Sequence, residues 1–282
     1  MAKMIETLGS IGEGYGVILC DVWGVLHNGM RAFPDAVTAL RAARARGQAV
    51  VLVTNSPRPR AGVADQLALL DVPADCYDAI VSSGDVTRRL IESGPRRVFH
   101  LGPDRDFALY DGLDVELCEE FEAQGVVCTG MFDDDETPDD YAGMLDRFRA
   151  RNLPFICANP DIVVERGDEL IWCAGALARD YARRGGRTEI AGKPHRPIYE
   201  AALAAASGLL GREVARSEAL AIGDGILTDI KGAADNGIDV LFVSGGIHAG
   251  EYGAAHAPDP AAIRAFLEKH GYAPVAVIPR LR

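Results

Sequence analysis

The chain has 282 residues, of which 29 are Lys or Arg and 41 are Asp or Glu, so its formal net charge is −12. Hydrophobic residues make up 48% and charged residues 25%, a balance that excludes a disordered or collagen-like chain. The acidic excess argues against a protein that binds nucleic acid, since contact with the phosphate backbone requires a basic face. The length allows one large α/β domain or two smaller ones.

The sequence predicts a cytoplasmic protein with no membrane partner. Its first residues have no apolar run resembling a signal peptide, and no uninterrupted apolar stretch approaches the length of a membrane span. None of the six cysteines belongs to a C-x-x-C pair, and five sit in or beside apolar segments. This pattern favours buried thiols in a reducing compartment over a zinc site or a disulfide framework.

Strands and helices alternate in the first part of the chain. Apolar runs predict strands at 16–21, 49–54 and 78–81. Between them, spaced apolar residues predict a helix over 33–46, and the proline at position 57 predicts a second helix running towards residue 70.

The middle of the chain has strand candidates of its own, at 97–101, 125–128 and 154–157. The acidic segment 133–140 has the composition of a metal-binding loop. We interpret it instead as a helix start, with Thr137 as N-cap and Pro138 at the first helical position. Acidic residues after that proline complement the helix dipole.

The alternation resumes late in the chain. Helices are predicted at 195–207, 229–236 and 260–269, and strands at 219–223 and 240–243. Strongly hydrophobic strands that alternate with helices predict an α/β fold with a parallel sheet covered on both faces.

Two polar features follow the first two strands. Asp21 comes directly after a buried strand, at the edge where parallel sheets bind ligands, so its carboxylate suits a nucleophile or a metal ligand. Thr54, Asn55 and Ser56 follow the second strand. Their hydroxyl and amide groups suit phosphate oxygens, and they suit simple capping of the next helix equally well.

Two more features lie in the last third of the chain. Lys193 stands between Gly and Pro, where it either neutralises a phosphate or steadies a carboxylate, or is an ordinary lysine in a surface turn. Asp224 and Asp229 flank a glycine-containing turn between a strand and a helix. Two carboxylates in such a turn suit a hard cation with oxygen ligands, and the alternative for Asp229 is a helix cap.

In this order the four features resemble the haloacid dehalogenase-like (HAD-like) hydrolase superfamily. The resemblance covers nearly the whole chain and rests on the segments 21–26, 54–56, 158–161, 191–194 and 223–229. It extends to class IIA, a subclass of capped sugar-phosphate, nucleotide and 4-nitrophenyl-phosphate phosphatases. The resemblance implies a Rossmann-like core domain formed by 1–84 and 190–282, with an inserted α/β cap domain at 85–189.

The resemblance also implies an activity, namely Mg²⁺-dependent hydrolysis of a small phosphorylated metabolite. Asp21 would attack phosphorus and form an aspartyl-phosphate. Thr54 and Asn55, with Ser56 beside them, would hold the transferred group, and Lys193 would offset its charge. These roles match the demands of phosphoryl transfer, which are chiefly in-line positioning and charge neutralisation.

For the metal, the resemblance implies Asp21, the backbone carbonyl of Trp23 and Asp224 as ligands. Asp229 would be a further ligand, or an anchor through water or Lys193. In the cap, Asn159 and Asp161 match a region that faces the active site in class IIA, so they are candidates for substrate binding, although an ordinary turn also explains them. Homodimers formed through the cap occur in class IIA, so a homodimer is expected.

One position departs from the family pattern. The residue two after the nucleophile is usually an Asp that serves as general acid and base, and here it is Trp23, whose indole cannot shuttle a proton. A positioned acid or base contributes about 10²–10⁴-fold, so we expect slow or altered turnover, worst for alkyl phosphates. His27 is a candidate replacement, but a hydrogen-bonded or exposed loop histidine is the preferred interpretation. The alternative function is a phosphate-ligand binding or regulatory protein with little turnover.

Overall fold

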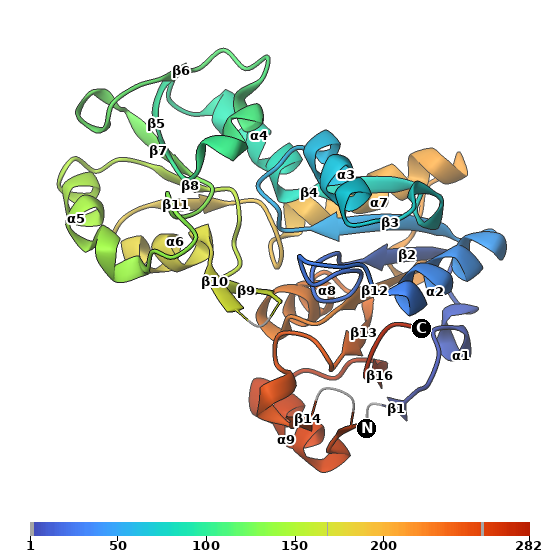
Figure 1. Ribbon diagram of the computed structural model, residues 1–282. Helices are drawn as coiled ribbons and strands as arrows, with labels where there is room; N and C mark the ends of the chain where they lie inside the picture. The colour runs from blue at the N-terminus through green and yellow to red at the C-terminus, as the bar shows by residue number, and fades with distance from the viewer. Residues whose placement is uncertain (1–2, 168, 255–256) are drawn as a thin grey trace. The chain divides into compact units, whose positions relative to one another are not determined.

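The computed structural model describes residues 3–167, 169–254 and 257–282, and the chain divides into two compact units. The first unit consists of Met1–Thr54, Ala64–Val81 and Tyr199–Arg282. The second consists of Asn55–Val63 and Ser82–Ile198. Each unit is built around its own sheet, labelled in Figure 1.

The first unit contains a seven-stranded sheet in the order β1-β16-β13-β12-β2-β3-β4. Its strands are β1 (Lys3–Met4), β2 (Val17–Cys20), β3 (Ala49–Thr54), β4 (Ala79–Ser82), β12 (Ala219–Gly223), β13 (Asp239–Val243) and β16 (Ala276–Ile278). Every residue of β2, β3 and β12 is buried, as expected for strands covered on both faces.

The order of this sheet reverses between β2 and β12. From β2 the chain proceeds outward to β3 and β4, whereas from β12 it proceeds the other way to β13 and β16. The two central strands pair in parallel, with Cys20 opposite Ile222. Ligands of open α/β sheets bind at the carboxyl ends of the strands where the order reverses, so this is the expected place for a site.

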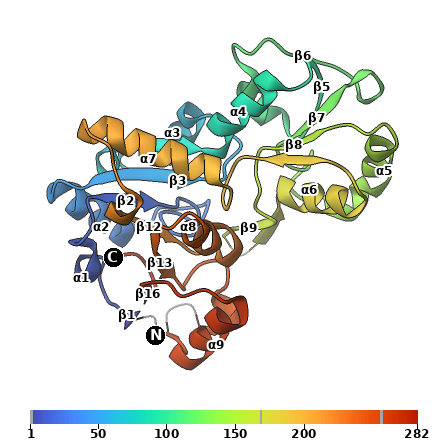
Figure 2. The ribbon, with the colours of Figure 1, turned by 180° about the vertical axis from the view of Figure 1, so that it is seen from behind.

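Helices cover both faces of the first sheet. The helices that lie wholly or mostly in the first unit are α1 (Gly9–Gly12), α2 (Pro34–Ala45), α3 (Arg60–Leu69), α7 (Arg196–Leu210), α8 (Lys231–Asp235) and α9 (Pro260–His270). Comparison of Figures 1 and 2 shows α2 on one face and α7 with α8 on the other. A short antiparallel pair, β14 (Gly253–Ala254) and β15 (Ala257–Pro258), precedes α9.

The second unit contains a five-stranded sheet in the order β11-β8-β7-β5-β6. Its strands are β5 (Arg97–Leu101), β6 (Glu116–Leu117), β7 (Gly125–Cys128), β8 (Phe155–Cys157) and β11 (Thr188–Ile190), and they pair in parallel. A separate antiparallel hairpin is formed by β9 (Val163–Arg166) and β10 (Glu169–Trp172).

Side chains of the second sheet alternate between two apolar clusters. Val126 and Phe155 pack with α5 (Ala142–Ala150) and α6 (Ala174–Arg183), in a cluster that Trp172 joins from the hairpin. Val127 and Ile156 pack on the opposite side, with α4 (Ser83–Ser93) and the segment around Tyr110. The unit is therefore three layers deep, as the period-two direction of strand side chains requires.

The predicted α/β fold with a parallel sheet is confirmed, and most predicted elements coincide with observed ones. Strands 49–54 and 219–223 have the predicted bounds, and the capped helix start at Thr137 is present. There the Asp140 carboxylate accepts from the Thr137 N–H at 2.8 Å. The acidic segment therefore contains a helix start, as we interpreted it.

Two predictions of local structure need correction, and several elements were not predicted. The helix predicted from Pro57 begins at Arg60, because Pro59 disfavours a helical conformation at the residue before it. The helix predicted over 229–236 begins earlier, as a π-helical turn at Ile226–Ile230 that leads into α8. The short strands β1, β6, β9, β10, β11, β14, β15 and β16 and the helices α1 and α4 were not predicted.

No helix among the described residues combines the length and the hydrophobicity needed to cross a membrane.

Candidate active site

Asp21 and Asp224 follow the two central strands of the first unit. The Asp21 N–H donates to the Ile222 carbonyl at 2.8 Å, which extends the β2–β12 ladder by one residue beyond β2. Asp224 comes directly after Gly223, the last residue of β12. Because the strands are parallel and in register, the two carboxylates emerge at the same edge of the sheet.

The π-helical turn after β12 holds Asp229. Its wide geometry shows in the Ile230 N–H, which donates five residues back to the Gly225 carbonyl at 3.0 Å. The Asp229 carboxylate in turn accepts from the Gly225 N–H at 3.0 Å. π-Helical turns are rare in proteins, and those that occur are often found at functional sites. Here the turn directs the Asp229 carboxylate back to Gly225, close to the end of β12.

The three carboxylates form one cluster. Asp21, Asp224 and Asp229 each offer an oxygen, these oxygens lie within 4.8 Å of one another, and each residue is 5–7% exposed. Across residues 3–167, 169–254 and 257–282, no other group of three His, Cys, Asp or Glu residues meets that distance. Like charges this close and this buried repel one another, and a hard divalent cation with oxygen ligands offsets the repulsion.

Two glycines pack against Asp224. A Cβ atom on Gly24 would lie 2.1 Å from the Asp224 Oδ2, and Gly24 also has a φ of +82°, which favours glycine. A Cβ atom on Gly246 would lie 1.9 Å from the same oxygen. The Ile247 N–H donates to this oxygen at 2.8 Å. Backbone from two loops therefore fixes the direction of the Asp224 carboxylate.

His27 lies in the short loop that follows Asp21. It is 1% exposed, and its Nδ1 accepts from the Gly29 N–H at 3.0 Å, so in this ring Nδ1 carries no proton. Its ring meets the edge of the Trp23 indole at a centroid distance of 4.9 Å. Burial lowers the pKa of His27 to about 4. The preferred interpretation of a hydrogen-bonded loop histidine is confirmed, and the ring is neutral near pH 7.

A second group of predicted residues meets inside the second unit. The Lys193 N–H donates to Asn55 Oδ1 at 2.7 Å, and Asn55 Nδ2 donates to Asp161 Oδ1 at 2.8 Å and to the Lys193 carbonyl at 3.3 Å. Asn55 and Lys193 are both almost fully buried. The Asn55 amide is thus engaged on its oxygen and on its nitrogen by two segments that are far away in sequence.

Close packing surrounds this group. A Cβ atom on Gly192 would lie 2.7 Å from Asn55 Oδ1 and 2.6 Å from the Ser83 hydroxyl, so only glycine allows Lys193 this approach. The peptide bond between Lys193 and Pro194 is cis. Asn159 takes part in a local turn. Its side-chain oxygen accepts from the Asp161 N–H at 3.1 Å. This bond closes an ordinary turn, which was the alternative interpretation of these two residues.

The two remaining predicted residues, Thr54 and Ser56, belong to different units. Thr54 is the last residue of β3 in the first unit and is buried. Ser56 belongs to the second unit, where its hydroxyl accepts from the Arg58 N–H at 3.3 Å and its carbonyl accepts from the Gly84 N–H at 3.0 Å. The first contact stabilises the turn that precedes α3, and the second joins that turn to the start of α4.

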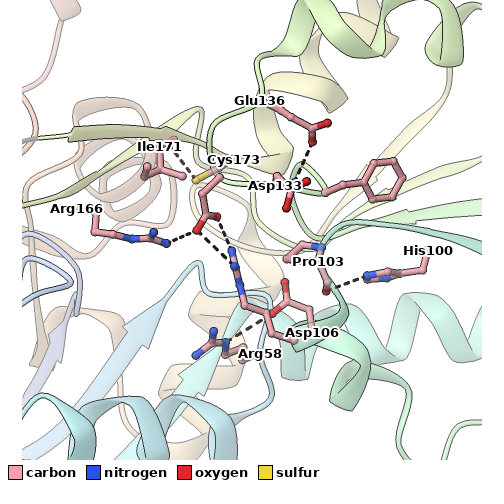
Figure 3. A network of polar contacts seen from close by, with 12 residues as sticks. Arg58, His100, Pro103, Asp106, Asp133, Glu136, Arg166, Ile171 and Cys173 are labelled. Carbon is pink, nitrogen blue, oxygen red and sulfur yellow. Dashed lines mark hydrogen bonds and ion pairs between the residues drawn. The ribbon is translucent and has the colours of Figure 1, made fainter.

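Two sets of ion pairs, which sequence reasoning missed, join distant segments of the second unit (Figure 3). Arg58 Nε lies 3.5 Å from Asp106, and Asp134 pairs with both Arg105 and Arg166, at 2.6 Å and 2.8 Å. Burial raises the pKa of the Asp106 carboxyl. The acidic composition of 133–140 was visible in the sequence, but no local signal identifies arginines so distant along the chain as its partners.

Comparison with known proteins gives consistent results. Residues 18–116 match a family described as haloacid dehalogenase-like hydrolase, and residues 190–274 match one described as HAD-hydrolase-like. A crystal structure of a hydrolase of the haloacid dehalogenase-like family from Brucella suis 1330 is 58% identical, with a TM-score of 0.90, over 99% of this chain and 100% of that one.

Two relatives have named activities. The 5'-nucleotidase YutF of Bacillus subtilis (strain 168) is 27% identical over 249 residues, which cover 83% of this chain and 88% of the relative. The glycerol phosphate phosphatase Rv1692 of Mycobacterium tuberculosis, solved in complex with magnesium, has the same fold. It is 24% identical, with a TM-score of 0.65, over 87% of this chain and 71% of that one.

Proposed function

This chain belongs to the haloacid dehalogenase-like hydrolase family, as a phosphoric monoester hydrolase of class IIA, and on that premise we propose that it hydrolyses a small phosphorylated metabolite through an aspartyl-phosphate on Asp21. The observation that carries the proposal is the cluster of Asp21, Asp224 and Asp229 at the strand ends where the sheet order reverses. A nucleophile and two further carboxylates at that edge suit metal-assisted phosphoryl transfer.

The donor set fits Mg²⁺. Magnesium takes oxygen ligands, usually one or two carboxylates plus water and phosphate oxygens, and the cluster supplies three carboxylates. Asp21 and Asp224 would bind the ion directly with the Trp23 carbonyl, and Asp229 would complete or anchor the set. When bound, Mg²⁺ supplies positive charge that offsets the charge of the phosphoryl oxygens. The fold neighbour from Mycobacterium tuberculosis, which was solved with magnesium, is consistent with this choice.

In the proposed reaction an Asp21 carboxylate oxygen attacks phosphorus as the bond to the leaving oxygen breaks. Water then hydrolyses the aspartyl-phosphate and regenerates the carboxylate. From the family resemblance we assign Thr54 and Asn55, with Ser56, to the transferred group, and Lys193 to its charge. We further propose that the insert at 85–189 acts as a cap that excludes water, and that the protein forms homodimers.

Trp23 shapes the expected chemistry. Neither its indole nor the neutral, buried His27 is a proton donor suited to the leaving group near pH 7. Loss of a positioned acid or base costs about 10²–10⁴-fold, and the cost falls hardest on alkoxide leaving groups. We therefore propose that aryl phosphates and phosphoanhydrides, whose leaving groups need no proton, are the better substrates.

The test is hydrolysis of 4-nitrophenyl phosphate with MgCl₂ by the wild type, by Asp21→Asn and by the matched surface control Asp35→Asn, which lies in the first turn of α2. We expect modest activity in the wild type and the control and none in Asp21→Asn. Intact-mass analysis of the acid-quenched wild type should show a phosphorylated chain that Asp21→Asn lacks.

Unchanged activity in Asp21→Asn would overturn the nucleophile assignment. Tight binding of phosphate compounds without turnover of any member of a broad panel would favour a binding or regulatory protein instead. We retain that alternative because Trp23 occupies the position of the family's usual acid and base.

A further inference from the structure

Asn55 connects Asp161 to Lys193 inside the second unit. The Asp161 carboxylate accepts from Asn55 Nδ2 at 2.8 Å, and the opposite end of the same amide accepts the Lys193 N–H at 2.7 Å. The planar amide has one orientation that satisfies both contacts, because only its nitrogen donates and only its oxygen accepts. Asn55 Nδ2 also donates to the Lys193 carbonyl at 3.3 Å, and the shorter bond to Asp161 favours the same orientation, with Asn55 Oδ1 directed to the Lys193 N–H.

Asp161 is itself held from two sides. Its N–H donates to Asn159 Oδ1 at 3.1 Å, and its carbonyl accepts from the Gly175 N–H at 3.1 Å in the first turn of α6. A Cβ atom on Gly175 would lie 2.5 Å from that carbonyl oxygen, so the helix start approaches Asp161 as closely as glycine permits. The carboxylate is thus presented to Asn55 from a rigid support.

The Lys193 end of the connection has little freedom. Lys193 is 3% exposed, Asn55 is 2% exposed, and Gly192 leaves no room for a Cβ atom between them. Without the Asp161 carboxylate, Asn55 Nδ2 would keep only its longer bond to the Lys193 carbonyl, at 3.3 Å, and would lose a buried acceptor, which costs free energy. We therefore expect loss of the Asp161 carboxylate to loosen the contact between Asn55 and the Lys193 backbone.

We propose that Asp161 is a positioning residue for Lys193, acting through the Asn55 side chain, rather than a residue that contacts substrate. The proposal rests on the proposed phosphatase activity for its effect on catalysis, but the connection itself is independent of that activity. It adds the placement of Lys193 to the role proposed above for Asn55, since both ends of the Asn55 amide are engaged within the second unit. Misplacement of a catalytic group by about 1 Å costs up to about 10²-fold, which sets the size of the expected effect.

The choice of variants separates positioning from direct chemistry. In Asp161→Asn the side-chain oxygen still accepts from Asn55 Nδ2, so we expect kcat on 4-nitrophenyl phosphate to stay within about threefold of the wild type. Asp161→Ala removes the acceptor, and we expect kcat to fall by about 10- to 100-fold. The matched control is Asp180→Asn, at a partly buried carboxylate on α6 that pairs with Arg179, and we expect this variant to have the kcat of the wild type.

A double-mutant cycle tests whether the effect passes through Lys193. In a Lys193→Met background, Asp161→Ala should cost less than about twofold further in kcat, since the group that it positions is already absent. Thermal denaturation of every variant shows whether each is folded. An undiminished cost in that background would overturn the proposal. Equal losses in Asp161→Asn and Asp161→Ala, or no loss in Asp161→Ala, would overturn it too.

Hydrogen exchange measures the connection without any substrate. The Lys193 N–H donates to Asn55, so a peptide covering 190–196 should exchange faster in Asp161→Ala than in the wild type, Asp161→Asn or Asp180→Asn. Unchanged exchange in Asp161→Ala would overturn the connection. If exchange responds as expected while the wild type hydrolyses no phosphate ester, the proposed function fails and the connection between Asp161 and Lys193 stands.

Discussion

The Asp224 carboxylate lies so close to Gly246 that a Cβ atom on residue 246 would stand 1.9 Å from its Oδ2. The neighbouring Ile247 N–H donates to the same oxygen at 2.8 Å. This loop follows β13, so its backbone supports a carboxylate that belongs to the end of the adjacent strand β12. The contact predicts that a methyl group at 246 displaces Asp224 from the carboxylate cluster.

We expect Gly246→Ala to weaken Mg²⁺ binding by about 10- to 100-fold, the usual cost of disturbing a group that orients a metal ligand. Isothermal titration with MgCl₂ measures the affinity. Gly250→Ala is the matched control in the same loop, because a Cβ atom there meets nothing within 4 Å. Equal affinities for the two variants would contradict the role of Gly246.

Asp229→Asn should change stability in opposite directions with and without metal. Three buried carboxylates within 4.8 Å repel one another, so removal of one charge should raise the melting temperature in EDTA. The Asn side-chain oxygen still accepts from the Gly225 N–H, so the turn is retained. The rise in melting temperature on adding MgCl₂ should be smaller than in the wild type.

Thermal denaturation with EDTA and with MgCl₂ measures both effects. Asp235→Asn serves as the control, since that carboxylate is at the surface and pairs with Lys231 on α8. A lower melting temperature for Asp229→Asn in EDTA would show that the carboxylates do not repel in the folded protein.

Trp23→Asp should place a proton donor two residues after Asp21, the proposed nucleophile. We expect it to raise kcat on an alkyl phosphate by about 10²-fold or more, within the range contributed by a positioned acid. The gain on 4-nitrophenyl phosphate should be smaller, because that leaving group needs no proton. The ratio of the two gains is the measurement, and Trp23→Asn is the matched variant without a proton donor. A similar gain in both variants would point to steric relief instead.

His27 should make the fold sensitive to mild acid. Burial lowers its pKa from 6.5 to about 4, so between these values the unfolded chain binds a proton that the folded chain does not. Stability from this group is complete above pH 6.5 and is lost as the pH falls towards 4, with a total of about 3 kcal/mol at 1.36 kcal/mol per pKa unit. Urea denaturation at a series of pH values measures the loss.

His27→Asn provides the comparison for that series. Its amide oxygen can accept from the Gly29 N–H in place of Nδ1, but it does not titrate. We expect its stability to fall less steeply than that of the wild type across the same pH range. Parallel curves for the two proteins would exclude His27 as the source of the acid sensitivity.

The sequence predicted what depends on local pattern. β3 and β12 have their predicted bounds because hydrophobic, β-branched runs bounded by turns are typical of buried strands. The parallel sheet then implied that Asp21 and Asp224 share an edge, and the structure brings Asp229 to them. The positions of these residues at strand ends, together with the family resemblance, predicted the carboxylate cluster.

Local sequence patterns could not predict contacts between distant segments. Nothing in the sequence around Asn55 indicates that its amide binds Asp161, since this contact depends on the path of the whole inserted segment. The π-helical turn was also missed. One turn that is wider by one residue changes the spacing of apolar residues too little to be distinguished from a regular helix. Pairs of this kind require three-dimensional coordinates.

The sheet order has a consequence for synthesis on the ribosome. β2 and β3 emerge early, but the central partner of β2 is β12, which follows the entire second unit in the chain. Until β12 appears, one side of β2 presents unpaired backbone groups on a strand whose residues are all apolar or Cys. The nascent protein must protect this edge while a complete second sheet is made, so the chain's greatest exposure to aggregation falls midway through translation.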